Sequence, residues 1–323
     1  MIVISEHDAR ALVSVEDAIE AVEQSFAAMA RGQARNYPVV REQVGLRDAV
    51  FGVKTGCDTG VPLLGLKAGG YWPHNLAKGL GNHQSSTLLF DPETGRASAL
   101  VSANYLTGVR TGAASAIATR HLSRPDSSVL GIIGTGVQAQ YQLRATLAVR
   151  PIRKVVAWNP SADKLATFGS MVRQMGLEFV AAVDCQAVAA SADILITVTP
   201  SKRALVDKSW VRTGTHISAM GADTRGKQEL DPLLVAAAAL FVDEAAQAIS
   251  IGECQHAYGA GLITGDSFRG SIGEVIAGLC DGRRTVQEIT LFDGTGVALQ
   301  DLVVAELAVR LATQKQVGSV VDY

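Results

Sequence analysis

An apolar run that ends in closely spaced glycines is the first feature of the chain with a chemical meaning. Residues 128–133 (SVLGII) lead into residues 134–139 (GTGVQA), which have the spacing Gly-x-Gly-x-x-Ala. Gly134 permits a tight turn, Gly136 lets backbone N–H groups approach a pyrophosphate, and Ala139 lets the next helix pack close to the sheet. The N-terminus of that helix adds partial positive charge. The stretch therefore predicts a dinucleotide-binding loop.

The end of the next predicted strand bears on which dinucleotide binds. An acidic residue about twenty positions after the glycine loop typically binds the ribose of NAD, whereas a nearby Arg accepts the 2′-phosphate of NADP. Here that position is Asn159, and the first cation after it is Lys164. The sequence favours NAD as NADH, with Asn159 at the ribose, and makes NADP the less favoured cofactor.

The elements that must position this loop alternate between short apolar strands and helical patterns. Strands are predicted at residues 129–133, 154–158, 179–183, 193–198, 215–220 and 240–243, and a helix at residues 165–175. Such alternation is typical of a parallel sheet covered by helices on both faces. We expect a Rossmann-type, doubly wound α/β domain.

The sequence before this domain has a different pattern. Ser14 and Asp17 form a capping-box pattern, and apolar residues then repeat at helical spacing up to Met29. Strand-like segments at 49–54, 63–67, 86–90 and 97–101 indicate an antiparallel sheet. A helix rich in small residues at 107–122 ends before Arg124, where we expect a domain boundary. A last helix, at 299–311, either covers the sheet or crosses back to the first domain.

Composition and charge argue against several classes of protein. The chain has 323 residues, of which 48% are hydrophobic and 19% charged, with a formal net charge of −2. It is long enough for two domains, and no basic tract indicates nucleic acid as a partner. The four cysteines lack metal-binding spacing, so we expect reduced thiols and no metal site. No signal peptide or membrane span is recognisable, and we expect a cytoplasmic protein without a membrane partner.

Several motifs, in order along the chain, resemble the ornithine cyclodeaminase/μ-crystallin family. They are residues 66–71 (LKAGGY), 107–115 (TGVRTGAAS), 134–139 (GTGVQA), 220–223 (MGAD) with 226–230 (GKQEL), and 292–296 (FDGTG). The resemblance implies an α+β substrate-binding and dimerisation domain, residues 1–124 plus 297–323. A Rossmann dinucleotide-binding domain, residues 125–296, is inserted into it.

The resemblance also implies a reaction. Members of the family reduce C=N bonds, or oxidise amino acids to imines, with a nicotinamide cofactor. Residues 65–73 (GLKAGGYWP) and 82–85 (NHQS) most resemble members that reduce iminosuccinate to aspartate. An NADH-dependent imine reductase that acts on a small imino acid as a homodimer is therefore expected. The alternatives are a ketimine or pyrroline-2-carboxylate reductase, an alanine dehydrogenase-like enzyme, an ornithine cyclodeaminase and, outside enzymes, a μ-crystallin-like ligand-binding protein.

Cationic residues at positions that match the family pattern are the candidates for the substrate. Arg110 is expected to bind the α-carboxylate, because the planar guanidinium gives two parallel hydrogen bonds, with Arg41 as a helper. Lys67 follows an apolar strand, so burial could lower its pKa and make it a catalytic proton donor that also contacts the substrate. His83 either touches the substrate or hydrogen-bonds within its domain.

The remaining candidates lie near the predicted cofactor. Asp223, at the carboxyl edge of the predicted sheet, is implied to contact the substrate nitrogen and to assist proton transfer. Lys227 and Glu229 either belong to the family's site or hold the loop after Asp223 in shape. The predicted cofactor-binding residues are Arg110, Thr111, Gly134, Thr135, Gly136, Val137, Gln138, Asn159, Thr199, Met220, Gly221 and Asp223.

One departure from the cyclodeaminase pattern bears on the substrate. Ornithine-specific members carry an acidic residue for the side-chain amine in the strand before the catalytic lysine. Here residues 49–54 (AVFGVK) contain no carboxylate and end in Lys54. A cation at this place repels ornithine and attracts a second carboxylate, which predicts a dicarboxylic imine.

Overall fold

The computed structural model describes residues 1–322, and the chain divides into two compact units. Unit 1 comprises Met1–Arg110 and the segment that starts at Val297, and unit 2 comprises Thr111–Gly296. The first division falls inside helix α3 (Asn104–Leu122), whereas the sequence placed it at residue 124. It falls there because the second part of α3 packs within unit 2: a Cβ at Gly112 would lie 2.7 Å from the backbone oxygen of Tyr141.

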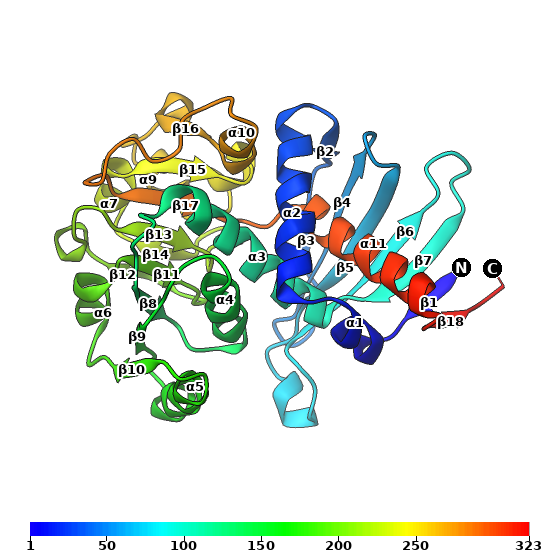
Figure 1. Cartoon of the computed structure of the whole chain (residues 1–323), viewed down its shortest axis with the longest axis horizontal. Coiled ribbons are helices and arrows are strands. Elements are labelled where there is room, and N and C mark those ends of the chain that lie inside the picture. Colours follow the sequence, from blue (N-terminus) through cyan, green and yellow to red (C-terminus); the bar gives the residue numbers. More distant parts are fainter. Residues whose placement is uncertain (323) are drawn as a thin grey trace. The chain divides into compact units, whose positions relative to one another are not determined.

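Unit 1 contains an eight-stranded sheet in the order β18-β1-β7-β6-β5-β4-β2, with β3 paired to β4 (Figure 1). Its strands are antiparallel except for the parallel pair β1 and β7. The predicted antiparallel sheet is confirmed. Its strands are β1 (Ile2–Ile4), β2 (Ala34–Asn36), β3 (Val40–Gln43), β4 (Val50–Asp58), β5 (Leu63–Tyr71), β6 (His83–Phe90), β7 (Ala97–Ser102) and β18 (Ser319–Val320).

Helices cover one face of this sheet. They are α1 (Glu6–Leu12), α2 (Val15–Ala30) and α11 (Ala298–Lys315), with the 3-10 turn η1 (Asn75–Lys78) between β5 and β6. The capping box of α2 is confirmed, because the Ser14 hydroxyl accepts the N–H of Asp17 at 3.1 Å. The last helix returns to unit 1 and lies close to the sheet: a Cβ at Gly65 would lie 3.0 Å from Leu302.

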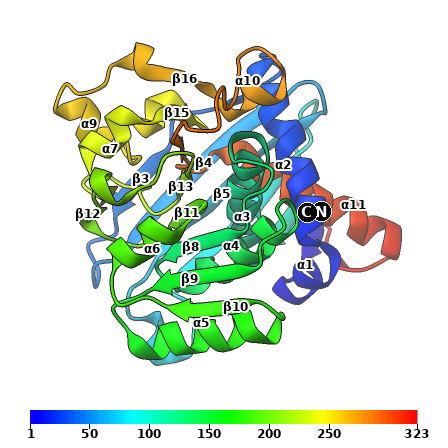
Figure 2. The same ribbon diagram turned by 60° about the vertical axis from the view of Figure 1, so that its left-hand side comes forward.

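Unit 2 is a doubly wound α/β unit. Its main sheet has eight strands, all parallel, in the order β10-β9-β8-β11-β13-β17-β15-β16, and Figure 2 shows helices in front of and behind them. The Rossmann-type fold class is confirmed. The strands are β8 (Val129–Ile133), β9 (Lys154–Trp158), β10 (Glu178–Ala181), β11 (Ile194–Thr197), β13 (His216–Ala219), β15 (Ala239–Val242), β16 (Phe268–Ser271) and β17 (Thr290–Asp293).

The remaining elements of unit 2 are short. A separate parallel pair consists of β12 (Lys202–Val206) and β14 (Gln228–Leu230). The pattern missed β12, β14, β16 and β17, which are three to five residues long and give too little periodicity. The helices are α4 (Val137–Leu147), α5 (Ala162–Gln174), α6 (Cys185–Ser191), α7 (Pro232–Ala237), α8 (Ala245–Ala248), α9 (Gln255–Gly259) and α10 (Ile272–Ile276), with the 3-10 turns η2 (Lys208–Trp210) and η3 (Gly265–Ser267).

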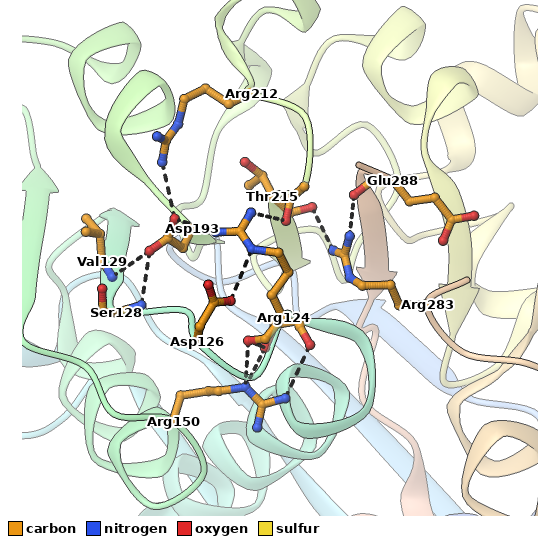
Figure 3. A network of polar contacts seen from close by, with 12 residues as sticks. Arg124, Asp126, Ser128, Val129, Arg150, Asp193, Arg212, Thr215, Arg283 and Glu288 are labelled. Atoms are coloured by element: carbon orange, nitrogen blue, oxygen red, sulfur yellow. Dashed lines mark hydrogen bonds and ion pairs between the residues drawn. The ribbon is translucent and has the colours of Figure 1, made fainter. Parts of the chain in front are cut away.

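A network of arginines and backbone groups holds the amino ends of the parallel strands (Figure 3). Asp193 accepts the N–H groups of Ser128 and Val129, both at 3.0 Å, and pairs with Arg124 at 3.0 Å. Arg283 donates to the carbonyl oxygen of Leu122 at the end of α3, at 2.7 Å. These contacts satisfy the polar groups of this edge within unit 2 itself. The glycine loop follows β8 at the opposite edge, where ligands of α/β sheets bind.

None of the helices in residues 1–322 combines the length and the apolar character needed to cross a bilayer.

Candidate active site

Three buried side chains from distant parts of the sequence meet in unit 1. The ammonium of Lys67 lies 2.9 Å from each carboxylate oxygen of Asp301. Arg110 donates from Nε to Asp301 Oδ1 at 2.8 Å and from Nη1 to Gln300 Oε1 at 2.9 Å. Two sequence placements need correction. Lys67 lies within β5 rather than after a strand, and Arg110 lies in the second turn of α3 rather than near its start.

The charges in this cluster shift each other's protonation. Burial lowers the pKa of Lys67 to about 7; Asp301 opposes the shift, while Arg110 and Lys54 add to it. Burial raises the pKa of Asp301, but Arg110, Lys67 and Lys54 lower it more, to about 2. Two cations thus share one ionised carboxylate whenever Lys67 is protonated. This surplus of positive charge suits an anionic ligand.

Strand register places the other predicted cations on the same face of the sheet. Lys54 in β4 lies directly opposite Lys67 in β5. Arg41 lies opposite Gly52, two residues before Lys54, and His83 lies opposite Tyr71, four residues after Lys67. Because opposed residues and every second residue of a strand share a face, the four cationic or titratable side chains lie on the face that α11 covers. Lys67 and Arg110 meet through Asp301, and Arg41 and His83 lie farther along this face.

In unit 2 the glycine loop has the geometry that a dinucleotide requires. Gly134 has φ +98°, and a Cβ there would lie 2.7 Å from the backbone oxygen of Val198. Gly136 caps α4 without a side-chain hydrogen bond, and no atom of the described chain lies within 4 Å of the place of its Cβ. The first N–H groups of α4 are therefore open to a phosphate. Thr135, Val137 and Gln138 belong to the same turn.

A cavity of about 380 Å³ adjoins this loop. Among the predicted cofactor residues it is lined by Gly134, Gly136, Asn159 and Thr199. The residues present thus fit a dinucleotide, because the glycines allow close approach to the pyrophosphate and Asn159 lies where a ribose is expected. The individual contacts of the predicted set stay predictions.

A buried carboxylate ties together two loops at this edge of the sheet. Glu229 accepts the N–H of Thr199, after β11, at 2.6 Å and the N–H of Gly221, after β13, at 3.0 Å. A second buried carboxylate, Glu253, accepts the N–H groups of Glu229 and Leu230. Burial raises the pKa of both carboxyl groups. The sequence left Glu229 with two possible roles, one in the family's site and one in holding the loop. These contacts show that it holds the loop. The sequence missed Glu253.

Asp223 lies on the loop that Glu229 holds. Its Oδ1 accepts from the ammonium of Lys227 at 2.6 Å, and the same ammonium donates to the carbonyl oxygen of Gly221 at 3.1 Å. The Asp223 side chain is 35% exposed, so a ligand can reach it. Lys227 therefore fixes both the backbone and the carboxylate of this loop.

Asp301 is the functional residue that sequence reasoning missed. It lies in the first turn of α11, between the buried apolar residues Leu299 and Leu302. A carboxylate on the buried face of a helix requires a cationic or hydrogen-bonding partner. That position in an apolar pattern was the signal that could have revealed it.

The comparisons with known proteins agree with this geometry. The model of the ornithine cyclodeaminase/mu-crystallin family matches residues 1–315. The chain belongs to this family. The iminosuccinate reductase of Paracoccus denitrificans (strain Pd 1222) is similar to this chain over the full length of both. It is 49% identical over 322 residues, with 100% of both chains covered.

Three solved structures are similar to the present chain over its whole length, each with a TM-score of 0.95. The iminosuccinate reductase of Paracoccus denitrificans in complex with NAD+ is 49% identical and covers 100% of this chain and 99% of its own. The Thermococcus litoralis Δ1-pyrroline-2-carboxylate reductase with NADH and L-proline is 32% identical, with 99% and 100% covered. An archaeal alanine dehydrogenase dimer with bound NAD is 37% identical, with 100% and 99% covered.

Proposed function

We propose that the protein is an NADH-dependent imine reductase that converts iminosuccinate to aspartate. The observation that carries the substrate is the position of Lys54 directly opposite Lys67. Together with Arg41 and Arg110 these residues offer separate cations to two carboxylates, and each desolvated anion needs its own partner. The 49% identity to an iminosuccinate reductase supports the same substrate.

The residues divide the work of imine reduction. NADH, when bound at the glycine loop, supplies the hydride that the C=N carbon accepts. Arg110 binds the α-carboxylate through its planar guanidinium. Lys67, whose pKa burial lowers to about 7, can give a proton to the nitrogen near neutral pH. Hydride on carbon and a proton on nitrogen together convert a neutral imine to the amine.

Asp223 has a supporting role in this proposal. Its carboxylate contacts the substrate nitrogen and assists proton transfer, and Lys227 holds it in place at 2.6 Å. Changing Asp223→Asn keeps the shape of the side chain and removes its charge. We therefore expect a reduced kcat. Near-wild-type turnover would remove Asp223 from the mechanism.

A comparison of substrates under matched conditions tests the proposed reaction. With NADH and ammonia, oxaloacetate should give aspartate much faster than pyruvate gives alanine or Δ1-pyrroline-2-carboxylate gives proline. Ornithine should be a poor substrate, because its side-chain ammonium would meet Lys54. Dominant formation of alanine or proline would reject the dicarboxylate and leave the family membership intact.

Charge variants of Lys54 sharpen this test. Lys54→Gln should lower kcat/KM for iminosuccinate by about tenfold, the effect of losing one charge-assisted hydrogen bond, and should change the rate with iminopropionate much less. Lys54→Arg is the matched control and should retain the preference for the dicarboxylate. Equal losses with both substrates would assign Lys54 a general electrostatic role.

We also propose that two copies associate through the second face of the unit 1 sheet. Apolar residues on neighbouring strands lie opposite each other on this face, such as Leu66 opposite Leu88 and Leu88 opposite Leu100. Phe51 is 42% exposed and Leu100 36%, and a hollow of about 260 Å³ there is lined by residues including Leu64 and Phe90. Exposed apolar area of this kind favours association, and the archaeal alanine dehydrogenase relative is a dimer.

The oligomeric state in solution tests this interface. Wild-type protein should have the mass of a dimer in light scattering, and the double variant Leu88→Glu with Leu100→Glu should have the mass of a monomer. Leu233→Glu, at a residue of unit 2 that is 54% exposed, is the control and should not change the mass. A dimer that survives the double variant would exclude this face.

The compartment is a separate part of the proposal. Cys57, Cys185, Cys254 and Cys280 are all free thiols. Burial raises the pKa of Cys185 and Cys254, which keeps these groups protonated. Free thiols are typical of reducing compartments, and we place the enzyme in the cytoplasm.

A further inference from the structure

Lys67 combines a buried amine with a second lysine directly beside it. Its side chain is 8% exposed, and Lys54 lies directly opposite it in the register of β4 and β5. Burial lowers the pKa of Lys67 to about 7, with Arg110 and Lys54 adding to the shift against Asp301. A lysine amine that is desolvated and lies next to another cation is partly neutral near pH 7. The neutral amine is a nucleophile toward carbonyl carbon.

The charged groups that face Lys67 come from three different elements. Lys54 belongs to β4, Arg110 to α3 and Asp301 to α11, whereas the residue opposite Lys67 on β6 is the uncharged Thr87. Two cations and one carboxylate therefore act on this amine. Their effects oppose each other, so both protonation states of Lys67 are populated near neutral pH. The protonated form can donate to an imine, and the neutral form can attack a carbonyl group.

The same cluster can hold the compound from which an imine forms. Lys67 Nζ and Arg110 Nε both donate to one oxygen, Asp301 Oδ1, at 2.9 and 2.8 Å. The contacts with Asp301 and Gln300 fix the guanidinium of Arg110, and its remaining N–H groups can bind a carboxylate. In a 2-oxo acid the carbonyl carbon is bonded to the carboxylate carbon. A carboxylate on Arg110 therefore brings the carbonyl carbon within reach of the Lys67 amine.

We propose that Lys67, activated by Lys54 opposite it, is also a nucleophile that forms the imine from a 2-oxo dicarboxylate and ammonia. This activity rests on the carboxylate-binding cations of the proposed function. The neutral amine attacks the carbonyl carbon, and uptake of a proton from solvent with loss of water leaves a protonated Schiff base. Ammonia adds to the same carbon, a proton moves from the added nitrogen to the Lys67 nitrogen, and the bond from carbon to Lys67 breaks.

The products of this step are those that the reduction needs. The released imine carries a proton, which the Lys67 amine accepts. The result is a neutral imine beside the ammonium of Lys67, the form that donates a proton during hydride transfer. Overall, the oxo acid and ammonia give the imine and water, and Lys67 is not consumed.

Reductive trapping tests the Schiff base without NADH or ammonia. The full chain is incubated with oxaloacetate and cyanoborohydride, and the modified residue is identified by peptide mass spectrometry. We expect an adduct on Lys67 that forms faster at pH 8 than at pH 6, because the neutral amine reacts. Lys67→Arg should abolish it, and Lys78, an exposed lysine of the same unit, is the internal control. No adduct, or equal modification of Lys67 and Lys78, would overturn the proposal.

Variants of Lys54 test the activation of the nucleophile. Pyruvate is the probe here, because it lacks the second carboxylate that Lys54 is proposed to bind. Lys54→Gln should slow trapping at pH 7 by about fivefold, the fall in the neutral fraction of Lys67 that a rise of about one pKa unit produces. Lys54→Arg keeps the cation and should retain the rate. Equal rates in the two variants would exclude Lys54 as the activating group.

The dependence of the rate on enzyme concentration tests where the imine forms. With oxaloacetate, ammonia and NADH, oxidation of NADH should keep rising with enzyme beyond the rate of imine formation measured without enzyme. A plateau at that rate would mean that the imine forms in solution and would overturn the proposal. Trapping on Lys67 without aspartate formation would contradict the proposed function alone, whereas aspartate formation without trapping would contradict only the nucleophilic role of Lys67.

Discussion

Asp293 and Asp301 are both buried and lie close together in the sequence, but their pKa values are shifted in opposite directions. Asp293 ends β17 in unit 2 and accepts the N–H of Cys254 at 2.9 Å. Burial, with a contribution from Asp243, raises the pKa of Asp293 to about 7. Asp301 contacts Lys67 and Arg110 in unit 1, and these cations lower its pKa to about 2 against the effect of burial.

The difference shows that the partner, and not the depth of burial, decides whether a buried carboxyl group is charged. Around Asp301 the partners are side-chain cations, whose surplus charge can also bind a substrate. Asp293, Glu253 and Glu229 accept hydrogen bonds from backbone N–H groups, which shape the loops at the carboxyl edge. The buried carboxylate of unit 1 thus lies among the proposed catalytic cations, whereas the buried carboxyl groups of unit 2 hold loops in place.

The largest expected effect follows from removing the charge of Asp301. Asp301→Asn leaves Lys67 and Arg110 buried without an anion, and we expect the free energy of unfolding at pH 7 to fall by about 3–5 kcal/mol. Asp293→Asn replaces a carboxyl group that is partly protonated at this pH and should cost much less. Denaturant unfolding of the two variants measures the contrast. Equal losses would mean that burial alone governs both sites.

The protonation of Lys67 gives an intermediate effect. If Lys67 donates the proton, kcat should fall as the pH rises through about 7, because the neutral amine cannot donate. Asp301 raises the pKa of Lys67 and Lys54 lowers it. Lys54→Gln should therefore move the break in the pH profile to a higher pH, as long as turnover remains measurable. A break that does not move would show that another group supplies the proton.

The smallest expected effect concerns the pH dependence of stability in unit 2. Because the pKa of Asp293 is raised from 3.8 to about 7, the native state holds a proton that the unfolded chain has lost in this range. The free energy of unfolding should therefore decrease as the pH rises from about 4 to about 7, and this stabilisation is lost above the folded pKa.

Asp293→Asn tests the sign of that slope. The variant should make the slope of the free energy of unfolding against pH less steep by up to about 1.4 kcal/mol per pH unit, which corresponds to one proton. Glu229 and Glu253 should still contribute a slope of the same sign, because burial raises the pKa of both. Asp193→Asn, at the arginine-rich amino edge, is a control of opposite sign. Burial raises the pKa of Asp193, but hydrogen bonds from Ser128 and Val129 and the charge of Arg124 lower it by more, so its pKa is lowered overall. The stability that Asp193 contributes is therefore lost as the pH falls.

Local patterns predicted much of the fold. The glycine loop, the capping box at Ser14, six of the eight strands of the parallel sheet and the four central strands β4 to β7 of the unit 1 sheet are confirmed within a few residues, because they depend on turn geometry, hydrogen bonding to near neighbours and apolar periodicity. The short strands β1, β2, β3 and β18 of unit 1 were missed. The ends of β4 and β5 were placed too early, since their later residues, 55–58 and 68–71, include glycines that interrupt the apolar pattern of a strand. The position of Lys67 within its strand was wrong for that reason.

What the sequence by itself determined is the set of residue types: a dinucleotide loop, cations for a carboxylate and a family pattern that joins them. Tertiary structure decided which groups face each other. The pairing of Lys54 with Lys67 depends on strand register, and the contact of Asp301 with Lys67 and Arg110 depends on the return of α11 to unit 1. Such contacts join residues that are far apart along the chain. Their effect on charge depends on distance and burial, which no local pattern encodes.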